Sequence, residues 1–481
     1  MWLTAIMEIL FAGAVVSLMA DFVAKRYGPR RVLVGLIAVG AIMLSILLIL
    51  ADWPTFANGP QVFQPTTSSL ATIYTLDNLG AFATFAVLVI GAMVSIYSLL
   101  YLDRKDNVGP FYALLLLLMG SLVGVISAGD YISLFLFWEG MSVAAYALVS
   151  FGRSALSLEA AVKYFFMAGI GSLLALYGIA LIYSASGSLQ LSAIAGIVSS
   201  GSQIAIFGLA ILVAGLGVEA AVVPLHTWLP DVYATAPIPS ASVISGAVTG
   251  VGVFAILKVL QPLVPRGTEI IVSHVSELQA LLVSLALITM FVGNLSGLYQ
   301  SNLRRLLSFS SIAQTGYMLA ALATLSVPGL VAVVFAIWNH GLLKSNFFML
   351  IGKENSDYES AELGMLSGAG RNDRPLGLLY ASSALAMMGA PPFGMFWSEI
   401  LVVLALLSTS TVLFFWVAVA VVGNILLSIG YYYRVINTVV FGKANGTVGR
   451  RKLSELAPSA GLLALSLLTG LLPFLFLGHL I

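Results

Sequence analysis

The sequence contains no cysteine and few charged residues. Asp, Glu, Lys and Arg together make up 9% of its 481 residues. The absence of cysteine excludes disulfides, thiolate metal ligands and iron–sulfur clusters held by this chain. The low charge separates the chain from soluble domains, in which roughly a quarter of the residues are charged. The net charge of +1 gives no indication of a nucleic-acid partner.

Apolar residues account for 60% of the chain, and the mean hydropathy is +1.04. Runs such as "ALLLLLMGSLVGVIS" (113–127) are typical of membrane-spanning helices. A β-barrel would instead show short segments of alternating hydrophobicity. The first apolar segment lacks a basic start and a small-residue cleavage site, so we interpret it as a retained span. The sequence predicts an all-α protein that crosses the bilayer many times.

The apolar runs predict fourteen spans in a single membrane domain. They cover residues 2–20, 32–51, 78–101, 110–128, 131–151, 158–184, 203–235, 237–261, 276–300, 303–324, 328–352, 375–407, 411–438 and 456–478. We divide the chain into spans 1–3 (1–107), a first five-helix repeat (108–262), a second (275–440) and span 14 (455–481). The polar segment between spans 2 and 3 is expected to form a short hairpin or a small helix.

Basic residues fix the expected orientation. Of the 21 Lys and Arg residues, all but Lys258, Arg266 and Lys344 fall at odd-numbered loops. Cytoplasmic loops are enriched in these residues. Odd loops, including the long one over 353–374, are therefore predicted to be cytoplasmic, with both termini outside. The expected location is a prokaryotic cytoplasmic (inner) membrane.

Prolines interrupt two of the spans. Span 7 contains Pro224 and Pro230, and span 12 contains Pro391 and Pro392. A proline removes one backbone N–H and frees the carbonyl four residues earlier, which for Pro224 is that of Ala220. Such groups survive in a bilayer only inside protein or beside a wet cavity. Two broken helices five spans apart suggest inverted repeats, spans 4–8 and 9–13, a signature of ion-coupled transport. The alternative is that the prolines merely kink the helices.

Three glutamates lie inside apolar spans. Glu139 is near the middle of span 5, Glu219 precedes the break in span 7, and Glu399 follows the break in span 12. A carboxylate at this depth costs roughly 3 kcal/mol on insertion scales, which favours a functional role. The alternative for each is a protonated acid that only serves packing. If Glu139 and Glu219 are neighbours, burial and like-charge repulsion favour the neutral form of at least one. Such a pair could relay a proton or bind Na⁺.

Basic and imidazole groups complete the candidate pathway. His340 and Lys344 are spaced i, i+4 in span 11 and so share one helix face. A histidine can change charge near neutral pH, so this pair is predicted to act as a relay. His226 and Asp231 flank the break in span 7 and are either functional or helix-end caps.

Other ionisable residues are interpreted as structural. Glu159 and Lys163 are spaced as an i, i+4 ion pair, and Lys258 is expected to extend toward the outer surface. Arg304 and Arg305 are interpreted as interfacial anchors. The sequence contains no phosphate loop, nucleophile triad or clustered metal ligands, so no cofactor or metal is expected.

Five motifs carry a family resemblance. They are "FWEGMSVAAYALVSF", "VPLHTWLPDVYATAPIPSASVISG", "SNLRRLLSFSSIAQTGYML", "NHGLLKSNFF" and "GAPPFGMFWSEI". Together they resemble the antiporter-like membrane subunits of respiratory complex I, Mrp antiporters, membrane-bound hydrogenases and the F420H2 dehydrogenase. The resemblance covers 77–434 and implies fourteen helices, two inverted half-channels and a central polar axis. It implies ion-pathway roles for Glu139, His340, Lys344 and Glu399.

Two positions depart from the family pattern. Glu219 and Gly250 stand where related subunits usually have lysines. The first half-channel therefore either has altered chemistry or is silent. The resemblance implies a proton-translocating, or Na⁺/H⁺-exchanging, subunit of a multi-subunit oxidoreductase or Mrp-type complex. Its partners would be other membrane subunits and redox subunits, which would carry the redox chemistry. The alternatives are an assembly paralogue and a stand-alone transporter of a small solute.

Overall fold

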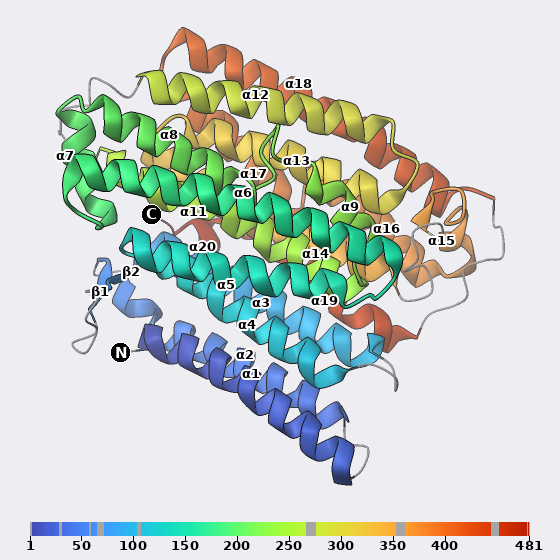
Figure 1. Cartoon of the computed structure of the whole chain (residues 1–481). Coiled ribbons are helices and arrows are strands. Elements are labelled where there is room, and N and C mark those ends of the chain that lie inside the picture. The colour runs from blue at the N-terminus through green and yellow to red at the C-terminus, as the bar shows by residue number, and fades with distance from the viewer. Residues whose placement is uncertain are drawn as a thin grey trace.

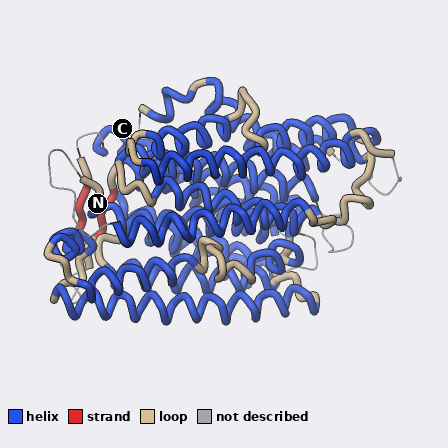
Figure 2. Tube along the Cα trace, turned by 90° about the horizontal axis from the view of Figure 1, so that it is seen from above, coloured by secondary structure: helices blue, strands red, loops and turns tan. Residues whose placement is uncertain are grey.

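Long, roughly parallel helices build almost the whole molecule (Figures 1 and 2). The computed structural model describes residues 2–27, 31–56, 59–64, 72–102, 107–265, 276–352, 361–443, 452–478 and 480. The helices of the first half are α1 Trp2–Tyr27, α2 Arg31–Phe56, α3 Asn78–Tyr101, α4 Val108–Ser127, α5 Tyr131–Ser150, α6 Ala155–Ser186, α7 Ile194–Ser199, α8 Gln203–Gly217, α9 Trp228–Thr235, α10 Ile238–Val243 and α11 Thr249–Leu260. Those of the second half are α12 Ser276–Leu298, α13 Leu303–Leu322, α14 Val327–Ile351, α15 Ala369–Asn372, α16 Arg374–Met387, α17 Gly394–Leu407, α18 Val412–Val435, α19 Leu453–Leu471 and α20 Pro473–Leu477.

Eleven helices in the described part of the chain are long and apolar enough to cross a membrane. α8 and α17 are apolar but shorter, because each is one half of an interrupted helix. α13 is long enough but is not among the eleven. It begins with two arginines and carries Ser, Thr, Gln and Tyr along its length, nearly all of them buried. Its polar side chains therefore face protein and not lipid.

Both predicted helix breaks are present. The helix that begins with α8 stops at Gly217 and resumes as α9 at Trp228. α16 stops at Met387, and α17 begins at Gly394. Each interval contains a cis peptide bond that precedes a proline, Pro224 in the first and Pro392 in the second. The prolines thus lie in the interruptions, as expected from the loss of a backbone donor.

A third irregularity lies between α10 and α11, which are joined by a π-helical turn, Ile244–Val248. This turn packs against α14 through two glycines. A Cβ on Gly246 would come within 3.0 Å of the carbonyl oxygen of Gly341. Small residues allow such close backbone approach between membrane helices. The contact holds α14, which carries His340 and Lys344, against the end of the first half.

A two-stranded hairpin precedes α3, where the sequence allowed a hairpin or a small helix. β1 Gln61–Phe63 and β2 Tyr74–Leu76 are antiparallel, with Gln61 opposite Leu76. The Lys258 side chain in the last turn of α11 donates a hydrogen bond to the Thr75 carbonyl at 3.0 Å. The lysine therefore extends toward this hairpin, although it is buried and not at the open surface.

Helix ends differ from the predicted spans by several residues. α1 continues to Tyr27, and α2 continues to Phe56, beyond the expected ends at 20 and 51. Hydropathy marks the apolar part of a helix, whereas a helix can extend past the bilayer on polar residues. Some of the basic residues used to predict the orientation lie outside the described residues, namely those at positions 30, 104, 105, 266, 353, 450 and 451. Residues 353–360 of the long loop also lie outside them.

Candidate ion pathway

Glu219 lies at the first helix interruption and is completely buried. Both of its carboxylate oxygens accept hydrogen bonds from hydroxyl groups. The Ser142 hydroxyl on α5 donates to Oε1 at 2.7 Å, and the Tyr164 hydroxyl on α6 donates to Oε2 at 2.6 Å. Burial of an acid without partners is costly, and these two donors offset that cost. The site is therefore built for a carboxyl group, although neither donor was predicted.

Glu139 lies beside this site. It is three residues before Ser142 on α5, hence on the same face of the helix. It is close enough to Glu219 for the charges of the two carboxyl groups to interact. Its side chain is only partly buried, and its Oε1 has no hydrogen-bond partner within the described ranges. The two acids therefore form a neighbouring pair in which only Glu219 is held by hydroxyl donors.

Aromatic rings support the Glu219 site from α6 and α9. The rings of Tyr164 and Trp228 are stacked, with centroids 4.0 Å apart and planes 5° from parallel. The Trp228 indole N–H donates to the carbonyl of Val218, the residue before Glu219, at 2.8 Å. The ring pair thus fixes the backbone that carries the acid.

The Ala220 carbonyl, which Pro224 was expected to free, has a partner inside the protein. The Thr315 hydroxyl on α13 donates to it at 2.8 Å. The N–H of Val223 in turn donates to the Thr289 hydroxyl on α12 at 3.2 Å. The polar groups released by the interruption therefore connect the first half of the chain to the second.

Lys344 is also completely buried. Its Nζ donates to the Leu307 carbonyl at 2.7 Å and lies 3.4 Å from the Tyr432 hydroxyl. Lys344 and Glu399 form no ion pair among the described residues. The lysine therefore has oxygen atoms of uncharged groups as its partners.

Glu399 lies near the start of α17 and is 8% exposed. The Gln314 side chain on α13 is its polar neighbour, and the Oε1 of Glu399 has no hydrogen-bond partner among the described residues. Gln314 shares a face of that helix with Ser310, one turn earlier. Ser310 and the Tyr432 hydroxyl lie 2.7 Å apart, and Tyr432 is the tyrosine next to Lys344. A line of uncharged polar groups on α13 and α18 therefore lies between Lys344 and Glu399.

This polar line continues past Glu399 toward α12. Tyr317, the next polar residue on the same face of α13, accepts a hydrogen bond from the Asn294 amide at 2.8 Å. The Asn294 carbonyl accepts one from the Tyr431 hydroxyl at 3.0 Å. The same amide is 3.1 Å from Asn424 on α18. The second cluster is thus a buried polar network around two ionisable groups.

His340 lies one helical turn before Lys344 on α14. It is 1% exposed, and neither ring nitrogen has a hydrogen-bond partner within the described residues. The hydroxyl groups of Ser245, Thr249 and Ser311 lie near the Tyr233 hydroxyl on α9, which has no hydrogen-bond partner in the part of the chain that the structure describes. Gly250, where a lysine was expected from the family, faces α14, and a Cβ there would lie 3.0 Å from Ile337. Hydroxyl groups therefore occupy the boundary that lacks a lysine.

His226 joins neither cluster. It is partly buried in the interruption, next to the backbone of Pro224. Of the residues predicted for the pathway, the structure groups Glu139 with Glu219, and His340 with Lys344 and, through side chains, Glu399.

Arg304 was interpreted as an interfacial anchor, and this is wrong. It is completely buried and donates from Nε to the Tyr233 carbonyl at 2.7 Å and from Nη2 to the Ala236 carbonyl. These carbonyls are at the end of α9, where helical hydrogen bonds run out. A cation at a helix C-terminus also complements the helix dipole. Arg304 therefore fixes α9 to α13.

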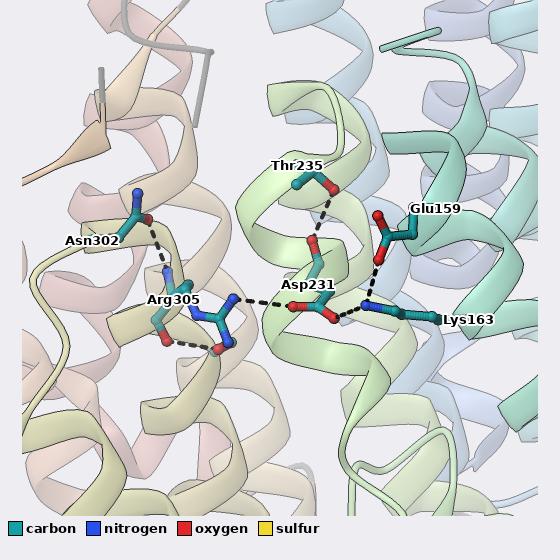
Figure 3. Close-up of polar contacts among 7 residues, drawn as sticks. Glu159, Lys163, Asp231, Thr235, Asn302 and Arg305 are labelled. Carbon is teal, nitrogen blue, oxygen red and sulfur yellow. Dashed lines mark hydrogen bonds and ion pairs between the residues drawn. The ribbon is translucent and has the colours of Figure 1, made fainter. Parts of the chain in front are cut away.

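Its neighbour Arg305 joins a row of charges at the surface (Figure 3). Asp231 on α9 pairs with Arg305 at 3.1 Å on one side and with Lys163 on α6 at 2.9 Å on the other. Lys163 also pairs with Glu159 at 2.8 Å, which confirms the predicted i, i+4 ion pair. Asp231 on α9 thus bridges α6 and α13 through its two ion pairs, and it does not cap α9.

The comparisons with known proteins bear on this fold. Residues 128–428 match the family model described as NADH:quinone oxidoreductase/Mrp antiporter, TM. Among curated proteins, the chain is 32% identical to NADH-quinone oxidoreductase subunit N of Rubrobacter xylanophilus over 72% of this chain and 71% of that one. It is 28% identical to subunit N of Laribacter hongkongensis, over 92% and 89%.

Solved structures are similar along nearly the whole chain. A chain of the archaeal membrane-bound sulfane sulfur reductase is 26% identical with a TM-score of 0.86, over 98% of this chain and 96% of that one. A chain of respiratory complex I from Thermus thermophilus is 26% identical with a TM-score of 0.79, over 98% and 99%. A chain of the Mrp complex from Dietzia sp. shares the fold at 21% identity and a TM-score of 0.86, over 98% and 96%.

Fold and site together define a polytopic helical membrane protein with ionisable groups buried at interrupted helices. The family match covers more than half of the chain and agrees with the relatives and structures above. The chain belongs to the NADH:quinone oxidoreductase/Mrp antiporter family. The resemblance inferred from the five motifs is thereby confirmed.

Proposed function

We propose that the chain moves protons across the membrane as an antiporter-like subunit of a multi-subunit oxidoreductase complex. The observation that carries this proposal is the burial of Glu219 and Glu399 beside the two helix interruptions and of Lys344 within α14. Charged groups at this depth are costly and, in membrane proteins, mark ion routes. The names of the curated relatives and the titles of the similar structures support a complex of this class.

Glu139 and Glu219 form the first half of the proposed route, and His340, Lys344 and Glu399 form the second. His226 is proposed only as a peripheral member, because it contacts neither half. Within the second half, a proton passes along the hydroxyl and amide groups that lie between Lys344 and Glu399. This arrangement replaces direct pairing of the two charges.

The proposed topology has fourteen spans. The eleven long apolar helices, the two interrupted helices and α13 add up to this number. Spans 4–8 and 9–13 would then be repeats of opposite orientation, since each has an odd number of spans and one interruption. The excess of basic residues at odd loops supports termini on the outer side. The protein is then an integral protein of a prokaryotic cytoplasmic (inner) membrane.

The carboxylate at position 219 bears on the alternative of a silent first half. Two neighbouring acids at this depth are costly, which favours a functional role over a role in assembly alone. Glu219 is held by two hydroxyl donors, and Glu139 lies next to it. We therefore propose a first half with altered chemistry that relays protons, or that binds Na⁺ when both acids are ionised.

The test is purification of the complex with its partner subunits and reconstitution in sealed vesicles. Redox turnover should acidify one side of the membrane, as reported by a pH-sensitive dye, and an uncoupler should abolish the signal. Repetition with and without Na⁺ distinguishes proton movement from exchange. Redox turnover without acidification would overturn the proposed function.

A further inference from the structure

The charged row around Asp231 lines a cleft in the protein surface (Figure 3). The cleft has a volume of about 210 Å³ and lies between α6, α9 and α13. Its lining includes Glu159, Ala160, Lys163, Asp231 and Arg305. The Lys163 side chain is 49% exposed and the Asp231 side chain 28% exposed, so the cleft is open to solvent.

The stacked rings of Tyr164 and Trp228 lie one helical turn below the cleft. Tyr164 follows the cleft residue Ala160 by four positions on α6, and Trp228 precedes Asp231 by three positions on α9. Residues three and four apart share a helix face. On both helices, therefore, a member of the buried ring pair lies one turn from a residue of the cleft lining.

The Tyr164 hydroxyl connects this floor to Glu219. It donates to Oε2 of the acid at 2.6 Å, and the acid is otherwise completely buried. Stacking at 4.0 Å on Trp228 holds the ring in place. The hydroxyl hydrogen, in contrast, is free to rotate about its C–O bond. The position of the ring is thus fixed, whereas the orientation of its hydroxyl hydrogen can change.

We propose that the cleft is the aqueous mouth of the first half-pathway and that the Tyr164 hydroxyl relays protons between it and Glu219. A proton that enters from the cleft is taken up by the phenolic oxygen while the phenolic proton passes to the Glu219 carboxylate. Neutral tyrosine and neutral glutamic acid result, and rotation of the hydroxyl resets the relay. This inference rests on the proposed function, because it supplies the access route to one of its sites.

The ion pairs of the cleft have a positioning role in this scheme. Lys163 from α6 and Arg305 from α13 hold Asp231 between them. Asp231 therefore keeps α9 against α6, and with it Trp228 against Tyr164. These groups maintain the floor of the cleft and do not themselves pass the proton.

The direct test measures exchange of the Glu219 carboxyl proton with D₂O by infrared spectroscopy of the purified complex. The C=O band of the protonated acid is identified by its loss in Glu219→Gln. The Tyr164→Phe variant keeps the stacked ring and removes the relay, so its exchange should slow roughly tenfold or more. Tyr177→Phe, a tyrosine of the same helix that is 54% exposed, is the matched control and should exchange as wild type. Equal exchange in all three proteins would overturn the proposal.

A second measurement separates a relay from a structural hydroxyl. A fluorinated tyrosine at position 164 keeps shape and hydroxyl but makes the phenol more acidic, so a relay predicts a several-fold change in exchange rate and a structural role predicts none. Both readouts are independent of pumping. If the vesicles do not acidify but exchange depends on Tyr164, the proposed function fails and the access route remains. If the vesicles acidify and the exchange rate does not depend on Tyr164, only this inference fails.

Discussion

Single buried acids and bases determine what this protein can do, and each has a different set of neighbours. Glu219 is held by two hydroxyl donors, whereas Glu399 has the amide of Gln314 and Lys344 has a carbonyl and a phenol. Neither half relies on a direct bridge between opposite charges. Substitution of the neutral groups between the charges is therefore as informative as substitution of the charged residues.

The first prediction concerns Glu219. Glu219→Gln keeps the shape of the side chain and removes its proton-accepting function, so the pumping rate should fall while assembly is retained. The rate in vesicles, with its dependence on pH and on Na⁺, measures the effect. If all three stay at wild-type values, the acid is structural and the first half is silent.

A second prediction concerns the groups between Lys344 and Glu399. The Tyr432 hydroxyl lies near both Lys344 and Ser310, at 3.4 and 2.7 Å. Tyr432→Phe removes this one oxygen from the buried line, and pumping should fall severalfold. The exposed Tyr433→Phe on the same helix is the control. Unchanged pumping in Tyr432→Phe would show that protons bypass this line.

At the scale of elements, α13 is the helix that connects the two halves. One of its faces carries Thr315 and Arg304, which contact the first interruption and the end of α9. Another carries Ser310 and Gln314, which face the second cluster. This double role explains why the helix is too polar to be recognised by hydropathy, although it is buried.

A third prediction follows for Arg304. Arg304→Gln leaves carbonyls at the end of α9 with weaker partners, which costs on the order of 1–3 kcal/mol in the folded state. The unfolding temperature of the purified protein in detergent should therefore fall. Arg371→Gln, at an exposed position on α15, should unfold at the wild-type temperature. Equal unfolding temperatures for the two variants would contradict the buried role of Arg304.

The sequence predicted the buried acids, Lys344 and both interruptions, because charges and prolines in apolar runs are conspicuous and costly. It did not predict Tyr164, Ser142, Gln314 or Tyr432. A hydroxyl or amide in a membrane helix is common, and only the tertiary structure decides which ones face an acid. Arg304 was misplaced for the same reason, since two adjacent arginines at a helix start look alike in sequence but point to different surroundings.

For the whole molecule, the proposed fourteen-span arrangement predicts that the long loop over 353–374 lies in the cytoplasm and the β1–β2 hairpin outside. The chain has no cysteine, so single cysteines report each side without background. Met365→Cys, 45% exposed, should be labelled by a membrane-impermeant thiol reagent only from the cytoplasmic side. Val62→Cys, 66% exposed in β1, should be labelled only from outside. Labelling of both from one side would refute the topology.

The central claim is that protons cross the membrane through the buried groups of this chain. The most direct measurement is the number of protons moved per electron pair in vesicles that contain the complex with Lys344→Met, which removes the buried charge and keeps a long apolar side chain. The account predicts an intact complex with a lower ratio than wild type, and a wild-type ratio for the exposed Lys452→Met. A wild-type ratio in Lys344→Met would contradict it.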